Sequence, residues 1–304
     1  MSSLIGYLYL YEMERQSVKQ NPALERTALL FRRPAELKAT QTAVAQVLRA
    51  VTSDAPVNHK LMVLARDPVL LLRFARTHGI HKSRDGARSL DILAALNRSS
   101  ISELRSFVTQ TVSGGYVGMN APTNLIDQER MNLHGFFVGL AAFAYVGHST
   151  TTELNASEMM AFGATHDVPI VALAKMQPDM YMNVCQFAIK CATNFATAFQ
   201  CIHPTSLHAM AGNAVVSWRL EESLASAWKA FDDNSVLEFD EVRYVLRVAD
   251  WMATELGFDW EPWRPPTTLP DPIKKWYEST QDVWEQAAMT TLALCKPLAT
   301  GLAA

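Results

Sequence analysis

Residues 131–148 read MNLHGFFVGLAAFAYVGH, and they open an 88-residue stretch, 131–218, that contains no arginine. The stretch carries only two lysines and four acidic residues, namely Lys175, Lys190, Glu153, Glu158, Asp167 and Asp179. Charged side chains are almost never fully buried without a partner, so a segment that lacks them is suited to an interior. The sequence therefore predicts that 131–218 forms the buried core of the protein.

Length and composition indicate a globular protein. A chain of 304 residues can bury a sizeable core, and 49% apolar with 19% charged residues is unlike a disordered chain. The four cysteines form no CxxC pair, which favours a reducing compartment. The first residues lack the basic region of a signal peptide, and no apolar run reaches the roughly 20 residues of a membrane span. We therefore expect a cytoplasmic protein with no membrane partner.

The apolar pattern after residue 34 is helical almost throughout. Apolar residues recur at helical spacing, as at Leu37, Val44, Val47, Leu48 and Val51. Asp67 followed by Pro68 is typical of a helix start, and Ser100 with Glu103 forms the pattern of a capping box. No pair of strands with hairpin turn residues is evident. The predicted fold class is all-α.

Breaks in this pattern predict a two-lobed helical protein with N-terminal and C-terminal extension arms. The glycine-rich segment 113–122 separates the lobes, and prolines between 258 and 272 indicate an extended linker. The four predicted parts are an N-terminal arm (1–34), a basic helical lobe (35–120), an apolar helical core lobe (121–257), and a proline linker with a C-terminal helix arm (258–304).

The two arms carry large apolar residues that could dock on a neighbouring copy. Arms of this kind generate head-to-tail assemblies. We predict a homo-oligomer that forms through Leu8, Tyr9, Trp260, Trp263, Trp276 and Trp284. The alternative, that both ends fold back on their own core, is equally compatible with the sequence.

Charge is divided unevenly along the chain. Residues 1–130 carry 17 basic against 11 acidic residues, a balance of +6, and residues 131–304 carry 10 against 19, a balance of −9, which together give the net charge of −3. The basic residues between 60 and 105 are Lys60, Arg66, Arg73, Arg76, Lys82, Arg84, Arg88, Arg98 and Arg105. Arginine suits phosphate contacts. This set predicts binding of single-stranded RNA, with Phe74, Phe107 and Tyr116 stacking on bases. The alternatives are a contact with an acidic protein surface and an ordinary solvated face.

Motifs of catalysis and metal binding are not evident. The histidine pairs His78/His81 and His203/His208 lack the spacing of HExxH, and no ExxH occurs. No GxSxG segment occurs either. We therefore expect no catalytic residues, no metal ligands, no cofactor and no enzymatic activity.

One polar face resembles an enzyme motif. Asn213, Ser217 and Glu221 stand at positions i, i+4 and i+8, and they resemble the magnesium-binding Asn-Ser-Glu motif of all-α terpene synthases. That family places its aspartate-rich motif upstream, whereas Asp232 and Asp233 lie downstream here. A polar stripe on an apolar helix explains the same residues. An all-α enzyme with an apolar pocket remains an alternative.

The combination of helical lobes, a basic region and terminal arms resembles, in architecture only, the helical nucleocapsid or coat proteins of RNA viruses. This resemblance implies an RNA-binding nucleoprotein that packages single-stranded RNA without sequence specificity into helical filaments. Its location would be the virion and the host cytoplasm. Such binding would weaken steeply with salt. A helical scaffold that binds other proteins through its tryptophan-rich tail is a further alternative.

Overall fold

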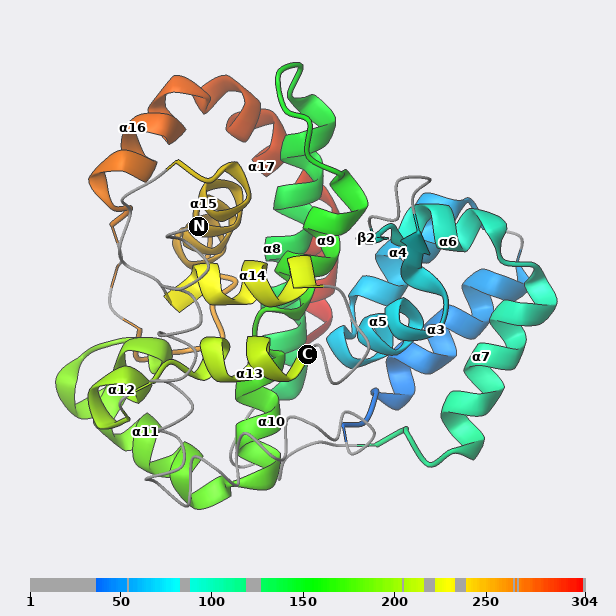
Figure 1. The fold of residues 1–304 in the computed structure, drawn as a ribbon, viewed down its shortest axis with the longest axis horizontal. Helices are drawn as coiled ribbons and strands as arrows, with labels where there is room; N and C mark the ends of the chain where they lie inside the picture. The colour runs from blue at the N-terminus through cyan, green and yellow to red at the C-terminus, as the bar shows by residue number, and fades with distance from the viewer. Residues whose placement is uncertain are drawn as a thin grey trace, which may run out of the picture.

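A computed structural model describes residues 37–53, 55–82, 88–118, 127–203, 205–215, 222–232, 239–264, 266 and 268–302. Over these residues the chain is built almost entirely of helices, which confirms the all-α prediction. Figure 1 shows two groups of helices, with the N-terminal helices α3–α7 on one side and the remaining helices on the other. Leu8, Tyr9, Arg84, Ser217 and Glu221 lie outside the described residues. The predicted limits of the four parts stay predictions.

The N-terminal group consists of short elements. They are α3 (Gln41–Thr52), α4 (Val57–Ala65), α5 (Pro68–Phe74), the π-helical turn η2 (Ala75–Gly79), β1 (Ile80–Lys82), β2 (Arg88–Leu90), α6 (Ile92–Arg98) and α7 (Ile101–Ser113). The predicted caps are present: Asp67 accepts a hydrogen bond from the Leu70 N–H, and Ser100 and Glu103 form a capping box. The antiparallel pair β1–β2 was not expected from the sequence.

The second group contains the core. Its helices are α8 (Gln128–His148), α9 (Ala156–Thr165), α10 (Val168–Met176), α11 (Pro178–Cys191), α12 (Phe195–Ile202), α13 (Leu207–Val215), α14 (Glu222–Asp232), α15 (Glu241–Glu255), α16 (Asp271–Ser279) and α17 (Gln281–Leu302). α8, α9 and α10 are buried along nearly their whole length. These three helices belong to the charge-poor stretch, so the prediction of a core there is confirmed.

α8 and α9 approach each other closely because glycines line their contact. A Cβ atom placed on Gly139 would lie 2.5 Å from the Met160 carbonyl oxygen, and one on Gly163 would lie 2.7 Å from the Cα of Gly139. Any larger residue would push the helices apart. This contact sets the distance between two nearby side chains, those of His134, which precedes Gly139 on α8, and His166, which directly follows α9.

The C-terminal segment, predicted as an arm, packs on the core of its own chain. α17 runs beside α8 in Figure 1, and the Trp284 ring stacks on Tyr145 with a centroid distance of 4.5 Å. Trp284 and Trp260 are buried, whereas Trp263 and Trp276 are partly buried against the same core. Homo-oligomers through the arms stay a prediction.

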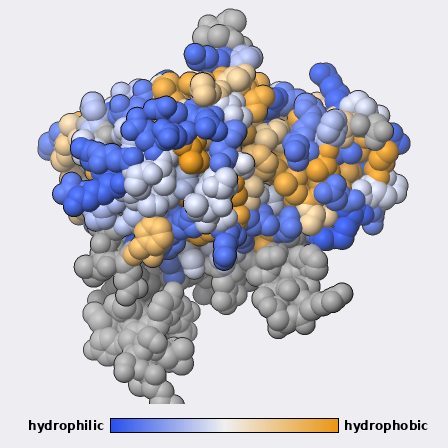
Figure 2. Space-filling view, turned by 90° about the horizontal axis from the view of Figure 1, so that it is seen from above, coloured by the Kyte–Doolittle hydropathy of each residue, from blue (hydrophilic) through white to orange (hydrophobic). Residues whose placement is uncertain are grey.

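The surface is mixed in character. In Figure 2 hydrophilic residues predominate toward one side of the face shown, and hydrophobic residues gather toward its middle and its other side. The N-terminal group itself exposes apolar side chains, such as Ile101 and Val112. Among the described helices none is long and apolar enough to cross a membrane.

Candidate metal centre

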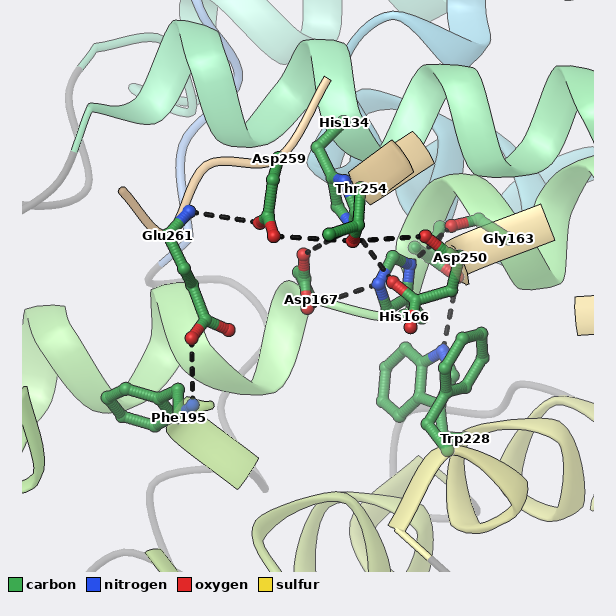
Figure 3. Close-up of polar contacts among 12 residues, drawn as sticks. His134, Gly163, His166, Asp167, Phe195, Trp228, Asp250, Thr254, Asp259 and Glu261 are labelled. Atoms are coloured by element: carbon green, nitrogen blue, oxygen red, sulfur yellow. Dashed lines mark hydrogen bonds and ion pairs between the residues drawn. The ribbon is translucent and has the colours of Figure 1, made fainter. Parts of the chain in front are cut away.

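Two histidines and two aspartates meet in the interior between α8, α9 and α15 (Figure 3). His134 comes from α8, His166 and Asp167 lie between α9 and α10, and Asp250 comes from α15. All four are less than 9% exposed. Ligand atoms of His134, His166 and Asp250 all lie within 4.8 Å of one another, a group that could hold a metal ion.

Both imidazole rings are oriented by backbone carbonyls. Nδ1 of His134 lies 3.0 Å from the Phe258 oxygen, and Nδ1 of His166 lies 2.7 Å from the Gly163 oxygen. A carbonyl only accepts hydrogen bonds, so each Nδ1 carries the proton. Each Nε2 then points into the cluster, and this is the arrangement by which metal-binding histidines are held in proteins.

The carboxylates complete the donor set. Nε2 of His134 lies 3.3 Å from Oδ1 of Asp250 and 3.7 Å from Oδ2 of Asp167, and Nε2 of His166 lies 3.3 Å from Oδ1 of Asp167. Ligand atoms bound at about 2.0–2.1 Å around a tetrahedral ion are separated by roughly 3.3–3.4 Å. Oδ2 of Asp167 is buried without a hydrogen-bond partner among the described residues. The donors therefore fit a single ion of the zinc or first-row transition-metal type.

Arg264 is the permanent cation of this centre. Its guanidinium donates to both carboxylate oxygens of Asp250, at 3.4 and 3.0 Å, and its Nε lies 3.6 Å from Oδ2 of Asp259. Burial alone would raise the pKa of Asp250, but the charge of Arg264 and the hydrogen bond from His134 hold it well below its usual range. A carboxylate has about four lone-pair sites, so Asp250 can bind Arg264 and still act as a ligand.

The pKa values of the two histidines are shifted in opposite directions. Burial lowers the pKa of His166. Burial also acts to lower the pKa of His134, but the hydrogen bond to Asp250 and the charge of Asp167 outweigh it and raise the pKa to about 9. Without a metal ion, His134 is therefore an imidazolium between two carboxylates. A metal ion would replace this proton as the positive charge.

A cavity of about 70 Å³ opens beside the cluster. It has room for several water molecules or for one small polar group. Its walls are polar, and they include Arg247 from α15, His208 from α13 and Gln200 from α12. Glu261 also borders it, and its Oε2 accepts a 2.8 Å hydrogen bond from the Phe195 N–H. Burial raises the pKa of Glu261 to about 8.

Comparison with known proteins gives one informative likeness. No family model matches the chain, and no curated protein matches it. The structure resembles that of the MmoQ response regulator (fragment 20–298) from Methylococcus capsulatus str. Bath, with 13% identity, a TM-score of 0.58, and coverage of 81% of this chain and 91% of that chain. A second MmoQ structure gives 13% identity, a TM-score of 0.56, and coverage of 82% and 92%. An HDOD domain protein with unknown function from Geobacter sulfurreducens aligns with a TM-score of 0.44, 17% identity, and coverage of 87% and 89%.

The predicted resemblance to viral nucleocapsid and coat proteins is wrong, and so is the function of RNA packaging drawn from it. The helices are arranged as in the MmoQ structure, over most of both chains. The architecture inferred from two lobes and two arms was not specific, because many helical proteins share those features.

The basic residues that suggested an RNA-binding face differ in burial and in the contacts that they make. Arg73 donates a 2.7 Å hydrogen bond to the Leu37 carbonyl, and its Cζ lies 3.8 Å from the centre of the Tyr116 ring. Arg66 and Lys60 are partly buried, whereas Arg76, Arg98 and Arg105 are exposed. The side chains of Lys82 and Arg88, on β1 and β2, are outside the described set, as is that of Asn213 on α13.

The aromatic residues predicted to stack on bases pack inside the protein instead. Phe74 and Phe107 are buried, and their rings meet edge to face with centroids 5.4 Å apart. Tyr116 is partly buried beneath Arg73. The rings of Phe74 and Phe107 therefore present no open face of the kind that single-stranded nucleic acid requires.

The residues of the cluster were not predicted from the sequence. Metal motifs are recognised by ligands a few residues apart, whereas His134, His166 and Asp250 come from three elements far apart along the chain. One signal was available. Asp167 is one of only four acids in the charge-poor stretch, and it directly follows a histidine. A titratable pair inside a predicted core is a candidate functional site.

A likeness at 13% identity shows the fold alone, so any chemistry has to be inferred from the residues of this chain. The chain has the helical fold of the MmoQ response regulator, with a buried His/Asp cluster beside a polar cavity.

Proposed function

We propose that this protein binds one divalent transition-metal ion through His134, His166, Asp167 and Asp250, and that it hydrolyses phosphate esters in the adjoining cavity. The observation that carries the proposal is the convergence of two oriented imidazole Nε2 atoms and two buried carboxylates. This donor set is typical of zinc and iron-type sites in hydrolases.

The cavity supports a phosphate group as the reacting part of the substrate. It is small, and Arg247 and His208 are among the residues that line it. Cationic and hydrogen-bond donor groups neutralise the charge that phosphoryl transfer develops. A bound metal ion would supply Lewis-acid activation of water and of the phosphoryl group. Oδ2 of Asp167 would accept the proton of the attacking water, because no described residue donates a hydrogen bond to it.

Metal content tests the first half of this proposal. Purified protein is reconstituted separately with Zn²⁺, Mn²⁺, Fe²⁺ and Co²⁺, desalted, and analysed by inductively coupled plasma mass spectrometry. We expect close to one ion per chain in the native protein and little in His166→Ala or Asp250→Asn. His148→Ala is the matched control, because His148 is an exposed histidine that lies outside the cluster. Equal metal content in all four proteins would refute the site.

Hydrolysis tests the second half. The loaded protein is assayed for phosphate release from phosphomonoesters, phosphodiesters and nucleoside triphosphates. We expect turnover with at least one class, and loss of turnover in Asp167→Asn even where that variant retains its metal. A protein that binds one ion but releases no phosphate from any class would refute the hydrolase and leave the metal site in place.

The pairing of Asp250 with Arg264 favours a second candidate function. Arg264 already satisfies both oxygens of Asp250, and His134 can carry the remaining positive charge. A cluster closed in this way needs no metal, and it would serve a signalling protein without catalysis. MmoQ, whose structure this chain resembles, is a response regulator, which agrees with this candidate. The absence of bound metal after reconstitution would favour it over the hydrolase.

A further inference from the structure

A second cavity lies on the other side of α8. It has a volume of about 310 Å³, is open to the surface, and is lined by residues of α3, the end of α4, α8 and α17. Asn132 and Phe136 line it, and each is two residues from His134. Two residues correspond to roughly 200° around a helix, so these side chains face away from the His/Asp cluster. The cavity is therefore distinct from the candidate metal centre.

Arg66 brings an unbalanced positive charge to this cavity. It is partly buried, its Cζ lies 5.7 Å from the centre of the Phe136 ring, and NH1 donates to Oε1 of Gln46 at 3.3 Å. Burial lowers its pKa. Among the described residues it forms no ion pair, and its Nε is buried without a hydrogen-bond partner. A buried charge is costly without a counter-charge, so this guanidinium is suited to an anionic ligand group.

The acidic group that interacts with Arg66 cannot act as its counter-ion. It is the thiol of Cys295, whose pKa burial raises to about 12, so the thiol is neutral. The nearest carboxylate on the cavity wall, Glu129, is exposed at its edge and makes no ion pair with Arg66. Among the described residues, no carboxylate pairs with Arg66 in the way that Asp250 and Asp259 pair with Arg264.

Asn132 supplies a hydrogen-bond acceptor. Its side chain is 6% exposed, borders the cavity, and has no partner for Oδ1 among the described residues. Burial of an amide oxygen without a hydrogen-bond partner is unfavourable, and a ligand N–H group would supply the missing hydrogen bond. Glu129 lies three residues earlier on the same face of α8 and extends the negative potential in that direction.

The apolar part of the wall is formed by Leu133 and Phe136 from α8, Ala43 from α3 and Leu298 from α17. Thr40, Thr42 and Gln46 add polar groups beside it. The cavity thus presents a cation, an amide oxygen with an acid beyond it, and an apolar surface of small-molecule size. These three features match the carboxylate, the ammonium and the side chain of one kind of molecule.

We propose that this cavity is a binding site for a free α-amino acid with an apolar side chain. Its carboxylate contacts Arg66, its ammonium donates to Asn132, and its side chain packs against Leu133 and Leu298. The site is independent of the metal-dependent function proposed above.

Calorimetric titration of the full-length protein tests the site. The probes are L-leucine and L-phenylalanine, together with two truncated analogues of leucine: 4-methylpentanoate lacks the ammonium, and 3-methylbutylamine lacks the carboxylate. We expect at least one of the amino acids to bind, and each analogue to bind leucine's site at least about 10-fold more weakly, since each loses one charge-assisted contact. Absence of binding by both amino acids at millimolar concentration would overturn the proposal. Equal affinity of leucine and its analogues would do the same.

Variants locate the binding. Arg66→Met removes the charge and keeps an apolar stem, whereas Ala43→Met fills the cavity without changing any charge. We expect both to abolish binding, and the exposed Arg98→Met to leave it within about 2-fold. Circular dichroism reports whether each variant is folded, and if Arg66→Met is not, Ala43→Met decides alone. Retained affinity in a folded Ala43→Met would overturn the proposal. Metal content should be unchanged in all three, which separates this site from the His/Asp cluster.

Discussion

The two cavities beside α8 differ in how their charges are balanced. Arg264, on one side, is bonded to Asp250 through both carboxylate oxygens and lies near Asp259. Arg66, on the other side, has no ion pair among the described residues. The first cation is part of the folded structure, whereas the second is available to a ligand. The local charge balance therefore identifies function better than the number of basic residues in a region.

The largest effect on stability is expected where the charge balance of the His/Asp cluster is removed, at Arg264. Arg264→Met leaves Asp250 and Asp259 buried without their cation, and removal of one partner from a buried pair costs about 3–5 kcal/mol. We expect a loss of this size in the free energy of unfolding, measured by urea denaturation with chelator present. Arg98→Met, at an exposed position, is the control and should change stability by less than about 0.5 kcal/mol. A loss no larger than in the control would show that Arg264 is not the counter-ion of this centre.

A second change acts on the cluster through the helix contact. Gly139→Val places side-chain atoms where the Met160 carbonyl lies 2.5 Å from a Cβ. Overpacking of this kind costs about 1–3 kcal/mol, and the separation of α8 from α9 should also lower metal content. Gly147→Ala is the control on the same helix, because nothing lies within 4 Å of its added Cβ. If Gly139→Val matched that control in melting temperature and metal content, the helix contact would not set the geometry.

Glu261 gives a pH-dependent test. Burial raises its pKa from 4.5 to about 8, so the folded state retains a proton that the unfolded state loses. Its contribution to stability is complete below about pH 4.5 and is lost as the pH rises toward 8. Glu261→Gln removes this loss, so we expect a flatter stability profile between about pH 5 and 8, with a difference of up to a few kcal/mol, since one pKa unit corresponds to about 1.4 kcal/mol.

The groups around Glu261 do not change between the two proteins. Arg264, Asp259 and Asp167 act on the charge of Glu261 in the native protein, and all three are still present in Glu261→Gln. Urea unfolding at several pH values with chelator present measures the profile, and Glu285→Gln on the exposed face of α17 is the control. Parallel profiles for native protein and Glu261→Gln would contradict the raised pKa.

The smallest effect is expected at Arg66. Arg66→Met removes a cation that has no carboxylate partner and keeps the stem that covers Phe136. We expect a change in the free energy of unfolding within about 1 kcal/mol. A loss as large as that of Arg264→Met would mean that the two cavities are balanced in the same way, and it would remove the contrast between them.

Local features of the fold could be predicted from the sequence. The caps at Asp67 and Ser100 depend on residues three positions away, so the pattern itself contains both partners. Asp127 caps the start of α8 in the same local way, because its side chain accepts a hydrogen bond from the Arg130 N–H. α17 continues past Pro297 to Leu302, since a proline near a helix end disturbs few hydrogen bonds.

The sequence determined the helical class and the charge-poor core, because hydrophobic periodicity and capping act over a few residues. It did not reveal the His/Asp cluster, since His134, Asp167 and Asp250 are brought together only by the packing of α8 and α9 and by α15. Only the tertiary structure decided which arginines are paired and which are not. Burial strengthens electrostatic interactions and makes an unpaired charge costly, and burial is a property of the folded chain.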